Sequence, residues 1–183
     1  MIKTRSVDKN KLVEFVKPYY VNKDIMHGMW HVELIEKAVS KILGRSDYNV
    51  ENKQLLFATY FHGIIYDYEA DIRKWLTEQG LFEKEIKQII TISHESHRYE
   101  IPQTLEGKIL HDAHIIEGGK SYMITKCLIT GSVRGQTLLE TIEYIETNIL
   151  DKSTCYLPET IPLLNEANLF AKEFLRELKS GIV

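Results

Sequence analysis

The 183-residue sequence has few cysteines, prolines and glycines, and each shortage excludes a class of protein. Two cysteines, Cys127 and Cys155, cannot build a disulfide framework, and there is no Cys-x-x-Cys pair for zinc or redox chemistry, so we expect two free thiols. Four prolines and ten glycines exclude a fibrous or collagen-like chain and leave no linker rich in these residues. We therefore expect one folded domain spanning residues 1–183.

Long apolar runs and blocks of like charge are also missing. Nowhere do 18 consecutive apolar residues occur, and the first ten residues contain no apolar stretch of signal length, so we expect a cytosolic protein without a membrane partner. The 26 acidic and 23 basic residues give a formal charge of -3 and are scattered along the chain. This balance argues against a nucleic-acid partner.

Several catalytic signatures are absent as well. The sequence has no Gly-x-Ser-x-Gly, no His-Glu-x-x-His and no Gly-x-Gly-x-x-Gly, which removes support for a serine hydrolase, a zincin or a dinucleotide-binding protein. Gly118-Gly119-Lys120-Ser121 looks like part of a phosphate loop. A Walker A motif would need a further glycine where His114 stands and a preceding strand, so that interpretation fails.

What the sequence does contain is helical periodicity along most of its length, because apolar residues recur at spacings of three and four. This pattern predicts an all-α fold, a compact multi-helix bundle of about eight helices. The segments with the clearest periodicity are 32–43, 55–62, 72–80, 83–93, 105–112, 120–129, 136–149 and 159–179. The last two are expected to be C-terminal packing helices, within about residues 136–180.

Seven histidines are the feature most relevant to function, because imidazole serves both metal binding and proton transfer near neutral pH. Six of them form three close pairs along the chain, and His62 stands alone at the end of an apolar segment. The pairs are His27 with His31, His94 with His97, and His111 with His114. Any one histidine is more often a surface or core residue than a ligand. A functional site is therefore indicated only by the order and spacing of several histidines together.

Four segments carry that pattern between about residues 20 and 130. They are Asp24-x-x-His27-Gly28-x-x-His31, then Phe61-His62-Gly63, then Ile92-Ser93-His94-Glu95-Ser96, and finally Leu105-Glu106-Gly107-Lys108-Ile109-Leu110-His111-Asp112-Ala113-His114. In order, spacing and apolar flanks this series resembles the HD-domain superfamily of metal-dependent phosphohydrolases, whose signature is a histidine, a later His-Asp doublet and a much later aspartate. The resemblance implies an all-α HD-domain bundle.

The resemblance also implies a metal centre. By the family pattern His31, His62 and Asp112 would be metal ligands, holding one divalent ion. Imidazole and carboxylate donors favour Mn, Fe, Co, Ni or Zn over Mg. The implied reaction is hydrolysis of a small phosphorylated substrate, such as a nucleotide, by a metal-activated water.

Further residues receive roles from the same pattern. His27 and His94 match positions expected to contact phosphate or to act as general acid. Lys108 matches a family lysine expected at the substrate, and Arg98, close to His97, is a second candidate for phosphate contact. Asp67 and Asp71, which follow the His62 segment, are candidate carboxylates for positioning the attacking water, although solvated or helix-capping acids are common at such places.

The sequence departs from the family at three carboxylates. Gly28, Gly63 and His114 stand where the family has aspartate, so the site is expected to hold its ion less tightly. Whether His111 or His114 turns inward to compensate is left open by the spacing. The same losses support an alternative, a catalytically degenerate HD fold that serves as a ligand-binding or protein-interaction module. A two-iron oxygenase using His94 and His97 is a third possibility, but it needs the bridging carboxylate that Gly63 lacks.

Overall fold

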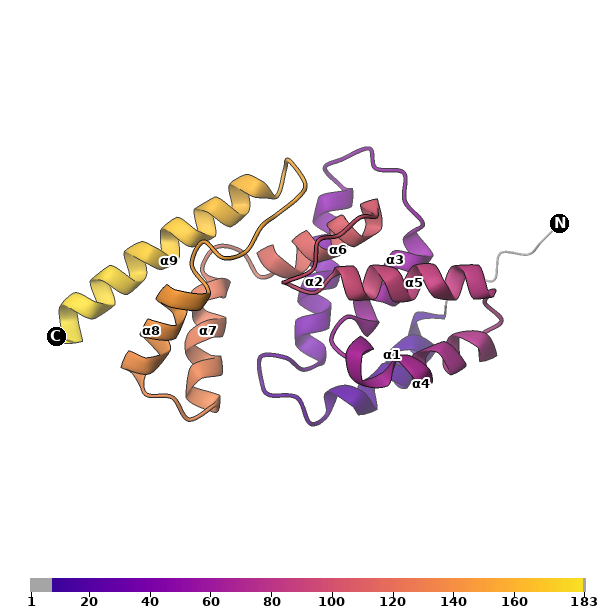
Figure 1. The fold of residues 1–183 in the computed structure, drawn as a ribbon, viewed down its shortest axis with the longest axis horizontal. Coiled ribbons are helices and arrows are strands. Elements are labelled where there is room, and N and C mark those ends of the chain that lie inside the picture. Colours follow the sequence, from indigo (N-terminus) through magenta and orange to yellow (C-terminus); the bar gives the residue numbers. More distant parts are fainter. Residues whose placement is uncertain (1–7, 183) are drawn as a thin grey trace.

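The computed structural model describes residues 8–182, and in this range the chain forms helices and no strands (Figure 1). The helices are α1 (Lys9–Tyr20), α2 (Met29–Leu43), α3 (Asn52–Phe61), α4 (Ile65–Glu78), α5 (Glu83–Glu95), α6 (Leu105–Ile116), α7 (Tyr122–Val133), α8 (Leu138–Asn148) and α9 (Ile161–Ile182). The all-α fold predicted from periodicity is confirmed.

Helices α1 to α6 form the main body, in which α3 packs on α5, and α6 packs on both α2 and α5. Two buried apolar clusters fill it. One joins α1, α3, α4 and α5 around side chains such as Leu12, Phe61 and Ile89, and the other joins α2, α3 and α6 around Ile35, Leu55 and Ile109. Because burying a side chain of this size stabilises a fold by about 1.5–3 kcal/mol, these clusters fix how α2, α3 and α6 lie relative to one another.

The last three helices gather around a cluster of their own, beside the main body in Figure 1. Ile124 of α7, Ile142 and Ile145 of α8, and Ala171 and Leu175 of α9 are its buried members. Helix α9 also packs on α6, which ties the group to the main body. The cavity described below lies between the two groups of helices.

A buried carboxylate joins α6 to the segment that leads into α9. Asp112 is fully buried, and its oxygens accept hydrogen bonds from the backbone N–H groups of Tyr156 (2.9 Å) and Leu157 (2.8 Å) and from the Thr160 hydroxyl (2.6 Å). Each hydrogen bond to a charged group contributes about 1.5–3 kcal/mol. Asp112 therefore holds the 156–160 segment against α6.

The beginning of α6 is fixed in a similar way from α5. The Thr104 hydroxyl caps the helix by accepting from the Gly107 N–H at 2.9 Å, and the Glu95 carboxylate accepts from the Gln103 N–H at 2.9 Å and from the Thr104 hydroxyl. A Cβ at position 107 would overlap the Glu95 carboxylate, which explains the glycine there. With both ends of α6 anchored, the side chains on its inner face have a defined position.

The predicted segments agree with the observed helices apart from their ends and one omission. Gly80, with φ of 79°, terminates α4 as the sequence predicts. Helix α6 continues to Ile116, one turn beyond the predicted end at residue 112. Helix α1 lies outside the predicted segments, because its mixed composition and internal Pro18 weaken the apolar stripe that Leu12, Val16 and Tyr20 nevertheless form.

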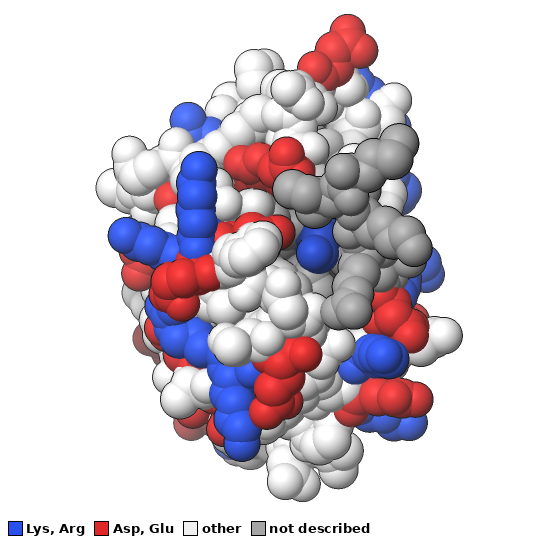
Figure 2. Space-filling model, turned by 90° about the vertical axis from the view of Figure 1, so that its right-hand side faces the viewer, with Lys and Arg blue, Asp and Glu red and all other residues white. Residues whose placement is uncertain are grey.

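The surface charges are mixed. On the face shown in Figure 2, basic and acidic side chains lie among one another and form no large area of one sign. Among the described residues, no helix combines the length and the hydropathy that crossing a membrane requires.

Candidate metal centre

Three histidines from three helices converge between α2, α3 and α6. His31 lies in the first turn of α2, His62 is the C-cap of α3, and His114 belongs to the last turn of α6. One ring nitrogen from each lies within 4.8 Å of the others, and the ring centroids are 5.1–5.3 Å apart. His31 and His62 are buried and His114 is partly buried, so the three rings form a compact group that could hold a metal ion.

The same nitrogen of each ring is occupied by a hydrogen bond to an acceptor. His31 Nδ1 lies 2.6 Å from a Glu117 oxygen, His62 Nδ1 lies 2.6 Å from the Thr59 carbonyl, and His114 Nδ1 lies 3.1 Å from the Ser96 carbonyl. Carbonyls and carboxylates only accept, so each Nδ1 carries the proton and each Nε2 keeps a free lone pair. This outer set of hydrogen bonds is the arrangement that fixes ring orientation in metal-binding histidines.

The free nitrogens face one another without a donor between them. His62 Nε2 is 3.2 Å from His31 Nε2, so two lone pairs oppose each other across the group. Burial holds the pKa of His31 and His114 well below the ordinary value, and it lowers the pKa of His62 to about 4. The rings are therefore neutral near pH 7. Three neutral imidazole nitrogens are a donor set that could hold a metal ion.

A buried ion pair supports His31 from behind. Glu117, only 5% exposed, accepts from His31 with one oxygen, and its other oxygen lies 2.5 Å from the Lys126 ammonium of α7. Lys126 also lies 3.3 Å from His31 Nδ1. Sequence reasoning missed both residues. The available signal was the position of Glu117, three residues after His114 and so on the same helical face.

Asp112, predicted as the third ligand, does not belong to the group. Its carboxylate is taken up by the hydrogen bonds to the 156–160 segment, and His114 contributes the third nitrogen instead. Two residues turn about 200° around a helix, so positions 112 and 114 face nearly opposite sides of α6. The ring that compensates is His114, whereas His111 is buried with its Nδ1 beside Asp112 at 3.2 Å, and its Nε2 has no partner within residues 8–182.

The missing carboxylate at Gly63 has a steric reason in this fold. A Cβ at position 63 would lie 2.8 Å from the Tyr20 hydroxyl and 3.1 Å from its ring. Tyr20 is buried and donates a hydrogen bond to the Tyr60 carbonyl at 3.0 Å, so it occupies this place stably. Gly28 is different: it is the N-cap of α2 with open space around it, its nearest neighbour being the Asp24 carbonyl at 4.0 Å.

Of the remaining predicted site residues, His27 lies beside the group. Its ring centroid is 5.7 Å from that of His31, and its Nδ1 lies 2.7 Å from an Asp24 oxygen, which also fixes the protonated nitrogen. His27 also lines the cavity next to His114. It is therefore the one predicted substrate-contacting histidine that reaches this cavity.

Apart from Arg98, which lines the cavity, the structure does not bring the other predicted site residues to it. His94 lies 2.9 Å from a Glu69 oxygen and packs against the exposed Tyr66 ring. Asp67 and Asp71 lie exposed on α4, and Lys108 is partly exposed on α6; none of the four is among the residues that line the cavity. His97 also packs edge-to-face against Tyr66, so the pair needed for a two-iron site lies outside the histidine group.

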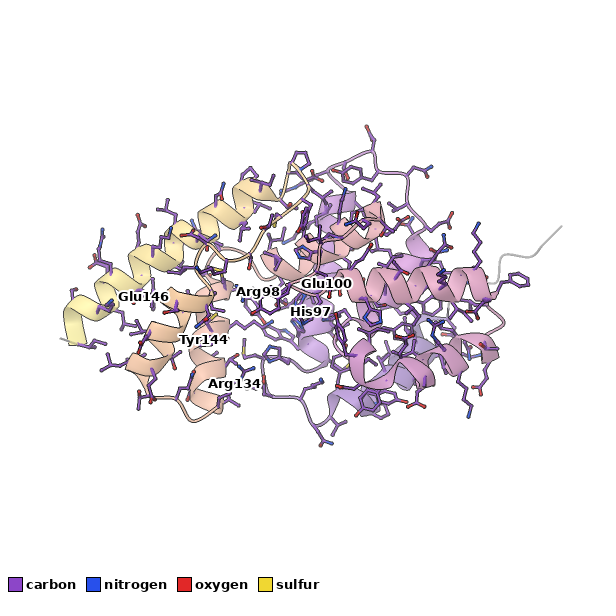
Figure 3. The ribbon with its side chains drawn as sticks, viewed as in Figure 1. His97, Arg98, Glu100, Arg134, Tyr144 and Glu146 are labelled. Atoms are coloured by element: carbon purple, nitrogen blue, oxygen red, sulfur yellow. The ribbon has the colours of Figure 1, made fainter. Side chains whose placement is uncertain are left out.

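The cavity that opens beside His114 has a volume of about 260 Å³ and lies between the main body and the α7–α8 pair. Three basic residues line it, Arg98, Lys126 and Arg134, together with the rings of Tyr122 and Tyr144. Figure 3 shows Arg98 from the main-body side near Tyr144 and Arg134 of the α7–α8 pair. Such a lining can neutralise a multiply charged anion and stack a planar group.

Arg98 also connects the two groups of helices. Its Nη2 donates to the carbonyls of Asn148 (3.4 Å) and Ile149 (3.3 Å) at the end of α8, where a cation complements the helix dipole. Its Nε is buried and has no partner among the described residues. One donor of this side chain is therefore left for a ligand.

Comparisons with known proteins identify the fold of the chain but not its activity. No family model matches the chain, and no curated protein matches it. Among solved structures, the crystal structure of Bacillus subtilis YpgQ in complex with ADP superposes with a TM-score of 0.75 at 14% identity, covering 94% of this chain and 97% of that one. Another structure of Bacillus subtilis YpgQ gives a TM-score of 0.71 at 15% identity, covering 96% and 98%. The chain thus has the same all-helical fold as YpgQ over nearly its full length.

Proposed function

We propose that the protein is a metal-dependent phosphohydrolase that acts on a nucleotide or another small phosphorylated metabolite. The observation that carries the proposal is the convergence of one ring nitrogen each from His31, His62 and His114 beside a cavity lined by basic side chains. The sequence resemblance to HD-domain phosphohydrolases supports the same reaction class. The cavity supplies the cations that a phosphoryl group needs, and the histidines supply the donors that an ion needs.

The ADP bound to YpgQ supports a nucleotide as the substrate class. In this chain Arg98 and Arg134 are placed to neutralise phosphate oxygens, because both line the cavity and Arg98 has a free Nε, whereas the Lys126 ammonium is paired with Glu117. Tyr122 and Tyr144 offer ring faces for a base. One ion held by the three histidines would polarise a phosphoryl oxygen and lower the pKa of a water.

His27 is the residue best placed to move a proton. Asp24 accepts from its Nδ1, so the Nε2 atom is free to accept a proton on the cavity side. An imidazole oriented by a carboxylate in this way is a common general base. Glu117 and Lys126 have a different role: they hold the His31 ring in the orientation that directs its Nε2 toward the other two histidines.

The test is metal analysis joined to a hydrolysis screen. Chelator-stripped protein is reloaded with Mn, Co, Ni or Zn, and release of phosphate or pyrophosphate is followed with nucleoside di- and triphosphates. We expect turnover that depends on the ion and is abolished by His62→Ala, but persists in His97→Ala, a histidine outside the group. Absence of turnover with every ion, or equal turnover in the two variants, contradicts the proposal.

The second candidate, a non-catalytic ligand-binding module of the same fold, is favoured by one observation. Tyr20 fills the space beside Gly63, so the lost carboxylate cannot be restored without repacking. This candidate predicts that ADP binds saturably in calorimetry while no ion supports its hydrolysis. Hydrolysis of any nucleotide by loaded protein rejects it.

A further inference from the structure

A second cavity, of about 390 Å³, lies on another side of α6, between α2, the turn that joins α6 to α7, and the beginning of α9. It shares no lining residue with the cavity beside His114. In Figure 1 the start of α9 runs beside α6, which is where this cavity is bounded. The turn between α6 and α7 contributes Gly118, Gly119 and Lys120, the glycine-rich segment that resembles part of a phosphate loop without being one.

One wall of this cavity carries an unbalanced row of positive charge. Lys37, Lys41 and Arg45 follow one another at intervals of four residues, so they lie on one face of α2 and its C-terminal extension, and all three line the cavity. Within residues 8–182 no carboxylate lies within 4.0 Å of any of the three cationic groups. Like charges four residues apart each cost a helix about 0.2–0.5 kcal/mol, and the helix dipole offsets this only in the last turn. A bound anion would remove that cost.

The other charged residues that line the cavity do not neutralise the positive charge of Lys37, Lys41 and Arg45. Lys120, on the opposite side, is paired with Glu166 at 3.0 Å. Among the described residues that line the cavity, the acid is Glu159; one of its oxygens accepts from the Tyr48 hydroxyl at 3.1 Å, and the other is buried with no partner in that part of the chain. Three unpaired cations therefore face one carboxylate, and the lining keeps a positive excess.

The rest of the lining is largely aliphatic. Leu34, Ala38 and Ile42 lie on α2 beside the basic row, Ile116 and Leu163 come from α6 and α9, and no aromatic ring is among the lining residues. Without a ring to stack on, a nucleobase gains little here, in contrast to the cavity that contains Tyr122 and Tyr144. A flexible aliphatic chain, however, would bury its surface against these side chains.

We propose that this cavity binds a small amphiphilic anion: an aliphatic chain of about ten carbons that ends in a carboxylate or a phosphate. The anionic head meets Lys37, Lys41 and Arg45, and the chain packs between Ile42, Leu163 and their apolar neighbours. The volume lies toward the lower end of small-molecule pockets, about 300–1,000 Å³, which fits one short chain and excludes a lipid with two acyl chains. This site is independent of the histidine group and of the reaction proposed there.

Calorimetry with four probes separates head from tail. Decanoate and decyl phosphate, used below their micellar concentrations, test the two head groups; inorganic phosphate has a head without a tail, and decyltrimethylammonium has the tail with the opposite charge. We expect one molecule of decanoate or decyl phosphate per chain, with the other two probes at least about tenfold weaker. If inorganic phosphate binds as tightly as decyl phosphate, or the cationic probe as tightly as the anionic ones, the proposal is wrong.

Variants locate the site. Lys41→Glu reverses one charge of the row, and Lys87→Glu makes the same change on an exposed lysine of α5 that does not line the cavity. We expect Lys41→Glu to weaken the better anionic probe by about tenfold or more, Leu163→Gln to weaken it as well, and Lys87→Glu to leave it unchanged. Circular dichroism and thermal midpoints verify that each variant is folded. Equal affinities in Lys41→Glu and Lys87→Glu, or no saturable binding to the unmodified protein, overturn the proposal.

Discussion

Replacing Glu117 by glutamine should weaken metal binding at the histidine group without disturbing any of the three ligands. In the native chain a Glu117 oxygen lies 2.6 Å from His31 Nδ1, and the carboxylate is buried. A glutamine amide oxygen can still accept that hydrogen bond. What is lost is the negative charge that makes the imidazole a stronger donor to a cation.

The expected size follows from the surroundings of the carboxylate. Loss of such an outer partner commonly costs about 10–100-fold in metal affinity. Lys126, at 2.5 Å from the other oxygen, already neutralises part of the Glu117 charge, so the effect should lie near the lower limit. We therefore expect about a tenfold weaker zinc affinity, which corresponds to about 1.4 kcal/mol.

The assay is competition between the protein and a chromophoric chelator for zinc at pH 7.5. Glu69→Gln is the matched control, because Glu69 lies 2.9 Å from His94 in a similar carboxylate–imidazole pair outside the group. We expect Glu117→Gln to lose affinity and Glu69→Gln to keep it. Equal zinc affinities in Glu117→Gln and the unmodified chain would refute the role assigned to Glu117.

Four further outcomes follow from the structure. In metal-free protein, burial lowers the pKa of His62 from 6.5 to about 4, so as the pH falls through this range the unfolded chain takes up a proton that the folded chain excludes. This residue alone should lower stability by about 3 kcal/mol as the pH falls from 6.5 to 4, and His31 and His114, whose pKa values are also lowered, add to the loss; urea unfolding against pH measures it, and a flat profile contradicts it. Asp112→Asn should lower the free energy of unfolding, measured in urea, by about 3 kcal/mol, because the new carboxamide N–H group faces backbone N–H donors. Its zinc affinity should equal that of the unmodified protein. A lower zinc affinity in the folded variant would show that Asp112 is a ligand after all. Gly28→Asp should raise stability by about 0.5 kcal/mol by capping α2 in open space, and a lowered thermal midpoint would contradict that. Gly63→Asp should lower stability by about 1–3 kcal/mol because its Cβ meets the Tyr20 hydroxyl at 2.8 Å; an unchanged midpoint would show that Tyr20 moves aside freely.

The sequence was sufficient for the fold class and for two of the three clustered histidines. His31 and His62 could be found because each stands at a motif position within a strongly periodic apolar segment, and periodicity determines which helical face is buried. The third position could not be found in the same way. His111, Asp112 and His114 all lie within one turn of α6, and the choice among them depends on how α6 is rotated against α2 and α5.

That rotation is set by long-range contacts. Asp112 accepts hydrogen bonds from backbone N–H groups 44 and 45 residues later in the chain. The segment 156–160 has no periodic pattern from which this contact could be predicted. For the same reason Glu117 and Lys126 were not predicted, since their pairing requires α7 to turn back beside α6. The order of motifs along a sequence carries no information about distances in the fold. For this reason it could not show which candidate site residues lie outside the lining of the cavity, namely Asp67, Asp71, His94 and Lys108.

Whether the three histidines hold a metal ion is decided by a crystal soaked in zinc or cobalt and measured at the absorption edge of that metal. We expect one strong anomalous peak bonded to the Nε2 atoms of His31, His62 and His114, with Asp112 still hydrogen-bonded to the 156–160 segment. A peak bonded to Asp112, or no peak between the three rings at saturating metal, would contradict it.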